Sequence, residues 1–220
     1  MALEIKRLHL STVTPPGTRA EWPVHGFVVT YPGGAALVDT GVGGPQGVQD
    51  NWRAVNVAAA GALAELGMSP ADISLVINTH LHFDHCGQNA VFKHAAFHVQ
   101  RAELDRARRE SPDLADWFDF AGARFELLDG DTEIVPGMSV ITTPGHTVGH
   151  QSVLIQGADG EDLLIGDAAY TPRLYSWPAG RELPPGQADD RDAWAASIGR
   201  IRSTAAARVH FCHHTDVIHA

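Results

Sequence analysis

The sequence predicts an α/β protein in which β-sheets pack against each other and helices cover their outer faces. Three observations predict this class: short strands come in consecutive runs, each half of the chain also contains a helix, and no internal repeat or low-complexity tract interrupts the pattern. With 220 residues and 44% hydrophobic content, the chain can bury one substantial core. We therefore expect a single domain over residues 1–220.

The elements of the first half follow from turn residues and apolar runs. Pro32-Gly33-Gly34 separates two apolar runs, as in a hairpin whose glycines adopt unusual dihedral angles. An alanine-rich stretch has helical composition and ends at Gly67, and residues 69–72 resemble a capped turn. The expected strands are residues 28–31, 35–39 and 75–78, and the expected helix is residues 55–66.

The second half contains further strands, separated by turns that often contain glycine, and two helices. The expected strands are residues 96–99, 125–128, 132–135, 139–142, 152–156, 162–165 and 209–212. The expected helices are residues 101–110 and 189–203. The last strand ends directly before two adjacent histidines.

The charge balance argues against a nucleic-acid partner. The chain carries 26 acidic and 16 basic residues, a formal charge of -10, which repels polyanions unless a local basic patch reverses the field. The densest basic run consists of Arg106, Arg108 and Arg109, interleaved with Glu103, Asp105 and Glu110. We interpret this run as a solvated helix face with ion pairs four residues apart.

The sequence also predicts a cytoplasmic protein that does not enter a membrane. Its opening residues lack the apolar segment of a signal peptide, and no later stretch approaches the length of a membrane span. Cys86 and Cys212 are too few for a disulfide framework, which fits a reducing compartment. Both are expected to be small buried packing residues.

Polar residues that can bind a metal gather directly after predicted strands. The 13 histidines are concentrated in a few places instead of being spread evenly. Strand ends held by a rigid sheet are where a preorganised site is most easily built. The candidate ligands are His80, His82, Asp84 and His85 after residues 75–78, His146 after 139–142, Asp167 after 162–165, and His213 or His214 after 209–212.

The spacing of the first four candidates favours a centre with two ions. Imidazole and carboxylate ligands together suit zinc and similar divalent ions. Residues two apart can point the same way, so His80 and His82 can share one ion while Asp84 and His85 reach a second. A surface loop rich in histidine is the alternative, but it would not predict further ligand candidates at three other strand ends. Asp167 taken alone could instead cap a helix.

The order and approximate spacing of these residues resemble the metallo-β-lactamase superfamily over about residues 27–213, and Asp39-Thr40-Gly41 looks like its early structural aspartate motif. The resemblance implies an αββα sandwich of two mixed sheets with helices on the outer faces. It also implies two divalent ions, which we expect to be zinc. The implied ligands are His80, His82 and His146 for one ion, Asp84, His85 and His213 for the other, and Asp167 as the bridge between them.

Within the superfamily, the chain looks most like the N-acyl homoserine lactonases. The segments that carry this resemblance are HLHFDHCGQN, TPGHTVGHQS and the DAAY that begins at Asp167. In that family, the tyrosine three places after the bridging aspartate donates a hydrogen bond to the substrate carbonyl. The resemblance therefore gives Tyr170 this role.

Two departures from the family's pattern affect the comparison. The family usually has Gly-Gly where this chain has Gly87-Gln88, and His-Asp where it has His213-His214. The second departure leaves the register of the last ligand open. The sequence FCH that ends at His213 aligns with the family's Phe-Gly-His, which favours His213 over His214.

The implied function is hydrolysis of N-acyl homoserine lactones or similar lactones. The expected partner is therefore a small-molecule lactone or ester substrate, and the chain could also form a homodimer. Hydroxide held by the metal ions attacks the lactone carbonyl, Tyr170 and one ion stabilise the oxyanion, and Asp84 passes a proton to the leaving alkoxide. Aromatic residues in irregular segments could form the wall of a groove for an acyl tail. These residues are Trp117, Phe118, Phe120, Tyr175 and Trp177.

Other functions stay open at this point. A phosphotriesterase or another ester hydrolase needs the same hydroxide and the same two Lewis acids. A mono-iron persulfide dioxygenase, which uses one ion on two histidines and one aspartate, is a different class that a metal count separates. A metal-holding binding protein without turnover is a third. Zinc nucleases need a polyanion-binding surface, and true β-lactamases lack an aspartate bridge at the position of Asp167, so both are disfavoured.

Overall fold

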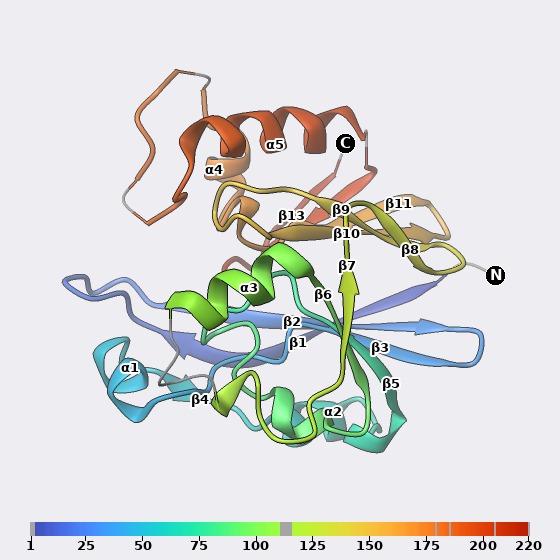
Figure 1. Ribbon diagram of the computed structural model, residues 1–220. Coiled ribbons are helices and arrows are strands. Elements are labelled where there is room, and N and C mark those ends of the chain that lie inside the picture. The colour runs from blue at the N-terminus through green and yellow to red at the C-terminus, as the bar shows by residue number, and fades with distance from the viewer. Residues whose placement is uncertain (1–2, 111–115, 179, 185, 205, 220) are drawn as a thin grey trace.

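The computed structural model contains two β-sheets that pack face to face, with helices on the outer face of each (Figure 1). It describes residues 3–110, 116–178, 180–184, 186–204 and 206–219. The first sheet has seven strands and the second has six, and each contains both parallel and antiparallel pairs. This arrangement confirms the predicted αββα sandwich of two mixed sheets.

The first sheet comes from the N-terminal part of the chain and the second from the C-terminal part. The strands of the first sheet are β1 (Glu4–Val13), β2 (Trp22–Tyr31), β3 (Gly34–Val38), β4 (Val55–Asn56), β5 (Ile73–Ile77), β6 (Ala96–Gln100) and β7 (Phe125–Leu128), in the spatial order β4-β1-β2-β3-β5-β6-β7. The strands of the second sheet are β8 (Thr132–Val135), β9 (Met138–Thr142), β10 (Gln151–Gly157), β11 (Gly160–Leu164), β12 (Arg208–His210) and β13 (Val217–His219), in the order β13-β12-β11-β10-β9-β8.

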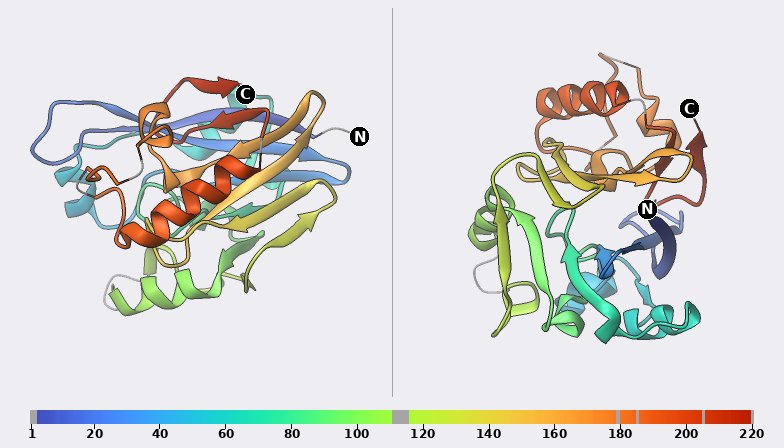
Figure 2. Two further views of the ribbon diagram at one scale, coloured as in Figure 1. Left: turned by 90° about the horizontal axis from the view of Figure 1, so that it is seen from above. Right: turned by 90° about the vertical axis from the view of Figure 1, so that its right-hand side faces the viewer.

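Helices lie outside both sheets, as the two further views show (Figure 2). They are α1 (Gln46–Asn51), α2 (Ala59–Glu65), α3 (Arg101–Glu110), α4 (Pro172–Tyr175) and α5 (Arg191–Ser203), and short 3-10 turns occur at Pro70–Asp72, Asn89–Phe92 and Gly166–Ala168. Helix α5 covers the second sheet because Trp194 and Ile198 pack in one buried cluster with Leu163 of β11. Among the described residues, no helix has the length and apolar character that a membrane crossing requires.

A buried apolar layer holds the two sheets together. It joins residues of β2 and β5, such as Val29 and Ile77, to residues of β9 and β10, such as Met138 and Val153. A second cluster packs α2 against the outer face of the first sheet. Burial of each large aliphatic side chain contributes about 1.5–3 kcal/mol to the stability of the fold relative to exposure. These layers therefore hold in place the sheet edges from which the loops extend.

Most predicted elements are present. Helix α3 and strands β7 and β8 have the predicted bounds, and the other predicted strands differ by up to two residues at an end, except β2, which begins earlier at Trp22. The helix expected over residues 55–66 begins later, at Ala59, because Val55 and Asn56 pair with β1 as strand β4. The sequence reading missed β1, β13, α1 and α4, which are short or carry many exposed polar residues.

The prediction that the charged run on α3 is a solvated helix face was wrong for two of its members. Glu103 is fully buried and Arg106 is 6% exposed, and these two side chains form an ion pair with each other. Arg106 also pairs with Glu110 four residues on, as expected. The acidic residue is buried because it finds partners in two other loops, which a helix sequence alone does not reveal.

Candidate metal centre

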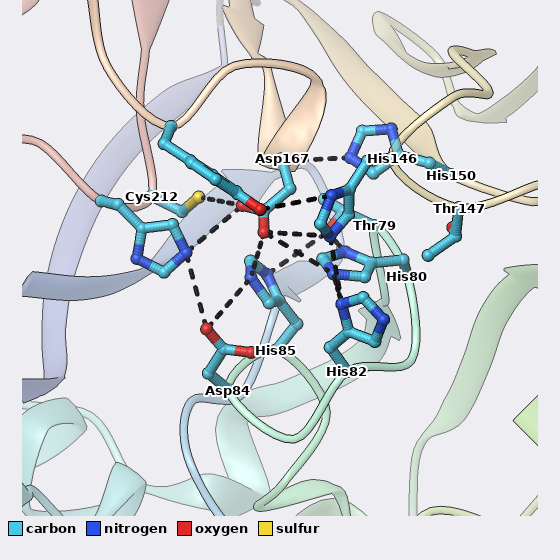
Figure 3. A network of polar contacts seen from close by, with 12 residues as sticks. Thr79, His80, His82, Asp84, His85, His146, Thr147, His150, Asp167 and Cys212 are labelled. Atoms are coloured by element: carbon cyan, nitrogen blue, oxygen red, sulfur yellow. Dashed lines mark hydrogen bonds and ion pairs between the residues drawn. The ribbon is translucent and has the colours of Figure 1, made fainter. Parts of the chain in front are cut away.

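All seven predicted ligands meet at one edge of the sandwich (Figure 3). The loops that carry them follow β5, β9, β11 and β12. Strands β11 and β12 are parallel, and β9 runs in the same direction because it and β11 are both antiparallel to β10. Their carboxyl ends therefore lie at one edge of the second sheet, opposite the loop that follows β5 of the first sheet.

Three histidines form what we call the histidine cluster: His80, His82 and His146. His80 Nε2 lies 3.0 Å from His82 Nδ1, and His146 Nε2 lies 3.1 Å from the same atom. Three imidazole nitrogens that converge in this way could hold one ion of the zinc type, which binds imidazole nitrogen at about 2.0–2.1 Å.

The other four predicted ligands, together with Cys212, form what we call the mixed cluster: Asp84, His85, Asp167, Cys212 and His213. His213 Nε2 lies 3.5 Å from Asp84 Oδ2 and 3.3 Å from Asp167 Oδ1. The other oxygen of Asp167, Oδ2, lies 3.4 Å from His85 Nε2 and 3.3 Å from His146 Nε2 of the histidine cluster. Asp167 thus faces both clusters, which is the position that a bridging ligand needs.

The second ring nitrogen is fixed in four of the five histidines. In metal sites, the nitrogen that does not bind the ion normally donates to a protein acceptor, which sets the tautomer and the ring orientation. His85 Nε2 is buried and has no hydrogen-bond partner among the described residues, so it needs a ligand. The donor set therefore fits two divalent ions. The contacts that fix the second ring nitrogens are His80 Nδ1 to Thr79 Oγ1 at 3.1 Å, His85 Nδ1 to Asp39 Oδ2 at 2.8 Å, His146 Nδ1 to Gln187 O at 3.0 Å and His213 Nδ1 to Pro23 O at 3.0 Å.

Asp39, at the end of β3, supports the loop that carries the first four ligands. Its carboxylate accepts hydrogen bonds from Thr79 N at 2.8 Å and Thr79 Oγ1 at 2.7 Å, in addition to the contact with His85. The backbone of Asp39 has a φ of 58°, a left-handed conformation that the surroundings must stabilise in a residue other than glycine. These contacts give the early aspartate motif a structural role.

The two clusters differ in their electrostatics. Burial lowers the pKa of His80 and of His82, and neighbouring histidines lower it further. Burial also opposes protonation of His85 and His213, but the neighbouring carboxylates, Asp167 first and then Asp84, together outweigh burial, and the pKa of both histidines is raised. The same two histidines hold the pKa of Asp167 well below its usual value although burial alone would raise it.

Two further residues contact Asp167 and were not predicted to take part. His150 Nε2 accepts a hydrogen bond from Asp167 N at 2.9 Å, and burial lowers the pKa of His150 to about 3, which keeps this acceptor neutral. Cys212 is buried as expected, but its Sγ also donates to Asp167 Oδ1 at 2.8 Å. His150 could have been found as the second histidine of TPGHTVGH, whereas nothing in the sequence distinguishes Cys212 from Cys86.

Both departures from the family's pattern have a structural explanation. The side chain of Gln88 accepts from Ala59 N at 2.8 Å and donates to Val57 O at 3.0 Å, so it caps the start of α2. His213 is 4% exposed and belongs to the mixed cluster, whereas the side chain of His214 is 36% exposed. Of the two adjacent histidines, His213 is the one that faces the other candidate ligands.

A cleft of about 210 Å³ opens onto both clusters. The ring of Tyr170 packs between those of Trp22 and His213, at centroid distances of 5.4 and 5.5 Å. Its hydroxyl donates to Gly186 O at 2.6 Å, and burial raises the pKa of Tyr170, so the phenol keeps its proton. The residues around the cleft are Pro15, Trp22, Trp52, His82, Phe83, Asp84, His146, Asp167, Tyr170, Gly186 and His213.

The aromatic residues predicted to form a groove lie elsewhere. Trp117 and Phe118 border a second hollow of about 210 Å³, which adjoins the cleft through the shared residues His82 and Phe83. The others are partly buried and lie outside the cleft: Phe120 packs against Phe97, Tyr175 against Phe211, and Trp177 beside Arg173 and Arg181. The aromatic wall of the cleft consists instead of Trp22, Trp52 and Phe83, which are distant in sequence and meet through the fold.

Comparisons with known proteins agree with this geometry. The family model of the metallo-beta-lactamase superfamily matches residues 19–213. An N-acyl homoserine lactonase of Bacillus sp is 34% identical over 186 residues, which are 75% of this chain and 71% of that protein. The crystal structure of a quorum-quenching N-acyl homoserine lactone lactonase has a TM-score of 0.81 and 26% identity, and covers 97% of this chain and 93% of that chain.

A further structure holds a ligand at its metal site. It is an N-acyl homoserine lactone hydrolase with the product N-hexanoyl-L-homoserine bound at the catalytic metal centre, with a TM-score of 0.77, 25% identity and coverage of 96% of this chain and 92% of that chain. The chain therefore belongs to the metallo-β-lactamase superfamily. Within the superfamily it is similar to the N-acyl homoserine lactonases, as the motifs around His80, His146 and Tyr170 indicated.

Proposed function

We propose that this protein is a dinuclear metal hydrolase that opens the ring of N-acyl homoserine lactones or similar lactones. The observation that carries the proposal is a pair of ligand clusters that share Asp167 and open into one cleft beside Tyr170. The relatives that are named lactonases support the choice of substrate class.

The ligands divide between the two clusters. Bound there, two divalent ions, which we expect to be zinc, would supply a water that ionises near neutral pH and Lewis-acid polarisation of the ester carbonyl. Because the second ring nitrogens are already held by hydrogen bonds, the imidazole rings would need little reorientation to bind the ions. His80, His82 and His146 would hold one ion and Asp84, His85 and His213 the other, with Asp167 between them.

Tyr170 and Asp84 carry the proposed charge and proton roles. The phenol of Tyr170 donates a hydrogen bond to the substrate carbonyl oxygen as negative charge develops on it, in exchange for its bond to Gly186 O. Asp84, 7% exposed at the cleft, carries a proton to the ring oxygen when the ester bond breaks. The overall step adds one water across the ester bond: oxygen and one hydrogen to the acyl carbon, and the other hydrogen to the alcohol.

The walls of the cleft fit a neutral substrate with an apolar tail. Trp52 and Phe83 lie with ring centroids 5.4 Å apart, and Trp22, which packs against the same apolar cluster, lies beside Tyr170. Apolar walls beside a few polar groups are typical of small-molecule sites. The adjoining hollow at Trp117 offers further apolar surface to a longer tail.

The substitution Tyr170→Phe tests the role of the phenol. It removes one hydrogen-bond donor and keeps the ring, so we expect the rate of lactone hydrolysis to fall about ten- to a thousand-fold while both metals are retained. Tyr175→Phe is the matched control, because Tyr175 packs against Phe211 away from the cleft, and its rate should equal that of the wild type. A Tyr170→Phe enzyme with the wild-type rate would remove this role.

The substrate class is tested with a panel of acyl lactones, phosphotriesters and simple esters, assayed with zinc-loaded protein. We expect the highest kcat/KM for lactones with an acyl tail. Protein that hydrolyses none of the lactones but cleaves phosphotriesters would contradict the proposal and support the alternative, a phosphotriesterase. Protein that requires a single iron ion and oxidises a persulfide would place it in the dioxygenase class.

A further inference from the structure

The fully buried carboxylate of Glu103, at the start of α3, has no place in the chemistry described above. Carboxylates are rarely buried unless they are paired and hydrogen-bonded, so the partners of this one show what its burial achieves. Its partners come from three different segments: the loop after β5, the loop after β9, and α3 itself. The first two of these loops carry the three residues of the histidine cluster.

Glu103 is bonded to the residues that adjoin the ligands in sequence. Its Oε1 accepts a hydrogen bond from Leu81 N at 2.9 Å, and Leu81 stands between His80 and His82. Its Oε2 accepts from Thr147 Oγ1 at 2.7 Å, and Thr147 follows His146 directly. One carboxylate therefore ties together the two loops that supply the histidine cluster.

The charge of this carboxylate is balanced locally. Arg106 Nη2 donates to Glu103 Oε1 at 2.6 Å, and both side chains are buried. Because each carboxylate oxygen can accept more than one hydrogen bond, Glu103 can pair with Arg106 and still accept from both loops. Among the described residues, no hydrogen bond of Glu103 reaches the mixed cluster.

The backbone of α3 also touches the loop after β9 with no space to spare. A Cβ atom on Gly149 would lie 2.3 Å from Glu103 N and 2.5 Å from Glu103 Cα, far inside van der Waals contact. Glycine is therefore needed at this position to let α3 approach the loop that carries His146. The close approach places Glu103 where its carboxylate reaches Thr147.

From these contacts we propose that Glu103 is a positioning residue that sets the spacing of the histidine cluster by clamping its two loops. In the part of the chain that the structure describes, no hydrogen bond joins this carboxylate to an imidazole, so it acts through Leu81 N and Thr147 Oγ1. The proposal rests on the metal-binding part of the proposed function and is independent of the lactone substrate. Its effect should therefore be specific to the ion at the histidine cluster.

Two variants break the clamp from opposite sides. In Glu103→Gln one carboxylate oxygen becomes an amide donor that faces another donor, and Thr147→Val removes the hydroxyl with little change of shape. We expect each variant to weaken zinc at the histidine cluster about 10–100-fold, the usual effect of losing an outer hydrogen-bond partner of a ligand set. Thr147→Ser keeps the hydroxyl and should restore most of the affinity.

Glu110→Gln is the matched control, because Glu110 pairs with the same Arg106 but is half exposed and touches neither loop through that bond. It should bind both ions as the wild type does. Zinc titration of metal-free protein against a chromophoric chelator gives the two affinities, and anomalous diffraction from crystals assigns each to its cluster. Thermal unfolding of each variant is measured alongside.

Selective loss at the histidine cluster, with rescue by Thr147→Ser, would support the clamp. Wild-type affinity in both Glu103→Gln and Thr147→Val would overturn it, and so would an equal loss at both clusters accompanied by a lower melting temperature, because that pattern indicates general destabilisation. Wild-type protein that binds no zinc would overturn the proposed function instead, so the two failures are distinguishable.

Discussion

The histidine cluster and the mixed cluster lie side by side but differ in charge. Burial keeps the pKa of His80 and His82 low, so each ring is neutral and offers one unprotonated nitrogen to a cation at neutral pH. In the mixed cluster the carboxylate of Asp167 raises the pKa of His85 and His213 against the effect of burial, so a cation has to displace protons there. Metal binding at the mixed cluster is therefore coupled to the release of protons, whereas at His80 and His82 it is not.

The clusters also differ in what supports them. Glu103 on α3 is bonded to the two loops of the histidine cluster, whereas Cys212 donates to Asp167 in the mixed cluster. Asp39 contacts His85 of the mixed cluster directly and reaches the histidine cluster only through Thr79. Asp167 is the residue that faces both. Changes to Asp167 should therefore affect both clusters, and changes to other ligands should affect one more than the other.

The largest effect is expected for Asp167→Asn, which removes the shared negative charge. Zinc content and activity should fall together, and activity should fall by more than the roughly 10–100-fold typical of an outer partner. Elemental analysis and lactone assays of the same preparation measure this. Asp216→Asn, at an exposed carboxylate near His214, is the control and should change neither quantity. Full metal content and full rate in Asp167→Asn would show that the bridge assignment is wrong.

The adjacent histidines at the end of β12 sharpen the comparison within one cluster. His213→Ala should remove a candidate ligand of the mixed cluster and lower its zinc affinity severely, while His214→Ala should leave zinc content nearly intact because the partly exposed His214 side chain contacts Asp216 instead of the candidate ligands. Zinc titrations of the two variants give the answer directly. If the losses are reversed, the ligand role passes to His214.

How far the sequence could predict this site depends on the kind of residue. The candidate ligands could be proposed from the sequence because metal binding restricts residue types and because each candidate follows an apolar strand, and the structure brings these side chains together. The cleft residues Trp22, Trp52 and Phe83 were missed because aromatic residues are as common in cores as in pockets, and the pairing that unites them spans distant segments. Glu103 was misjudged for a related reason, since its partners lie in two other loops. The single domain, the cytoplasmic location and the possible homodimer stay predictions.

The smallest effect on zinc content and activity is expected at Asp162, whose hydrogen-bond partners belong to neither cluster. This 1% exposed carboxylate accepts from Arg208 at 2.7 Å and from His210 at 2.7 Å. Burial alone would raise the pKa of Asp162, but these hydrogen bonds outweigh it and the pKa is lowered in the fold. The resulting stability is present above the unfolded pKa of about 3.9 and is lost as pH falls through the lower folded pKa.

Asp162→Asn should therefore lower the free energy of unfolding at pH 7 by about 1.5–3 kcal/mol, with zinc content and activity unchanged. The gap to the wild type should narrow as pH falls below about 4, because Asp162 of the unfolded wild-type chain then takes up a proton while the folded carboxylate, with its lowered pKa, still holds its charge. Urea unfolding of both proteins across this pH range measures the gap. A gap that is constant with pH would show that the ion pair is not its source.

The central claim is that two ions, one at each cluster, together produce the hydrolytic site. The most direct measurement is a titration of metal-free protein with zinc, with hydrolysis of an N-acyl homoserine lactone followed at each ratio. We predict that activity rises until two equivalents of zinc are bound per chain and then stays level. A plateau at one equivalent, or no lactone hydrolysis at any ratio, would contradict the account.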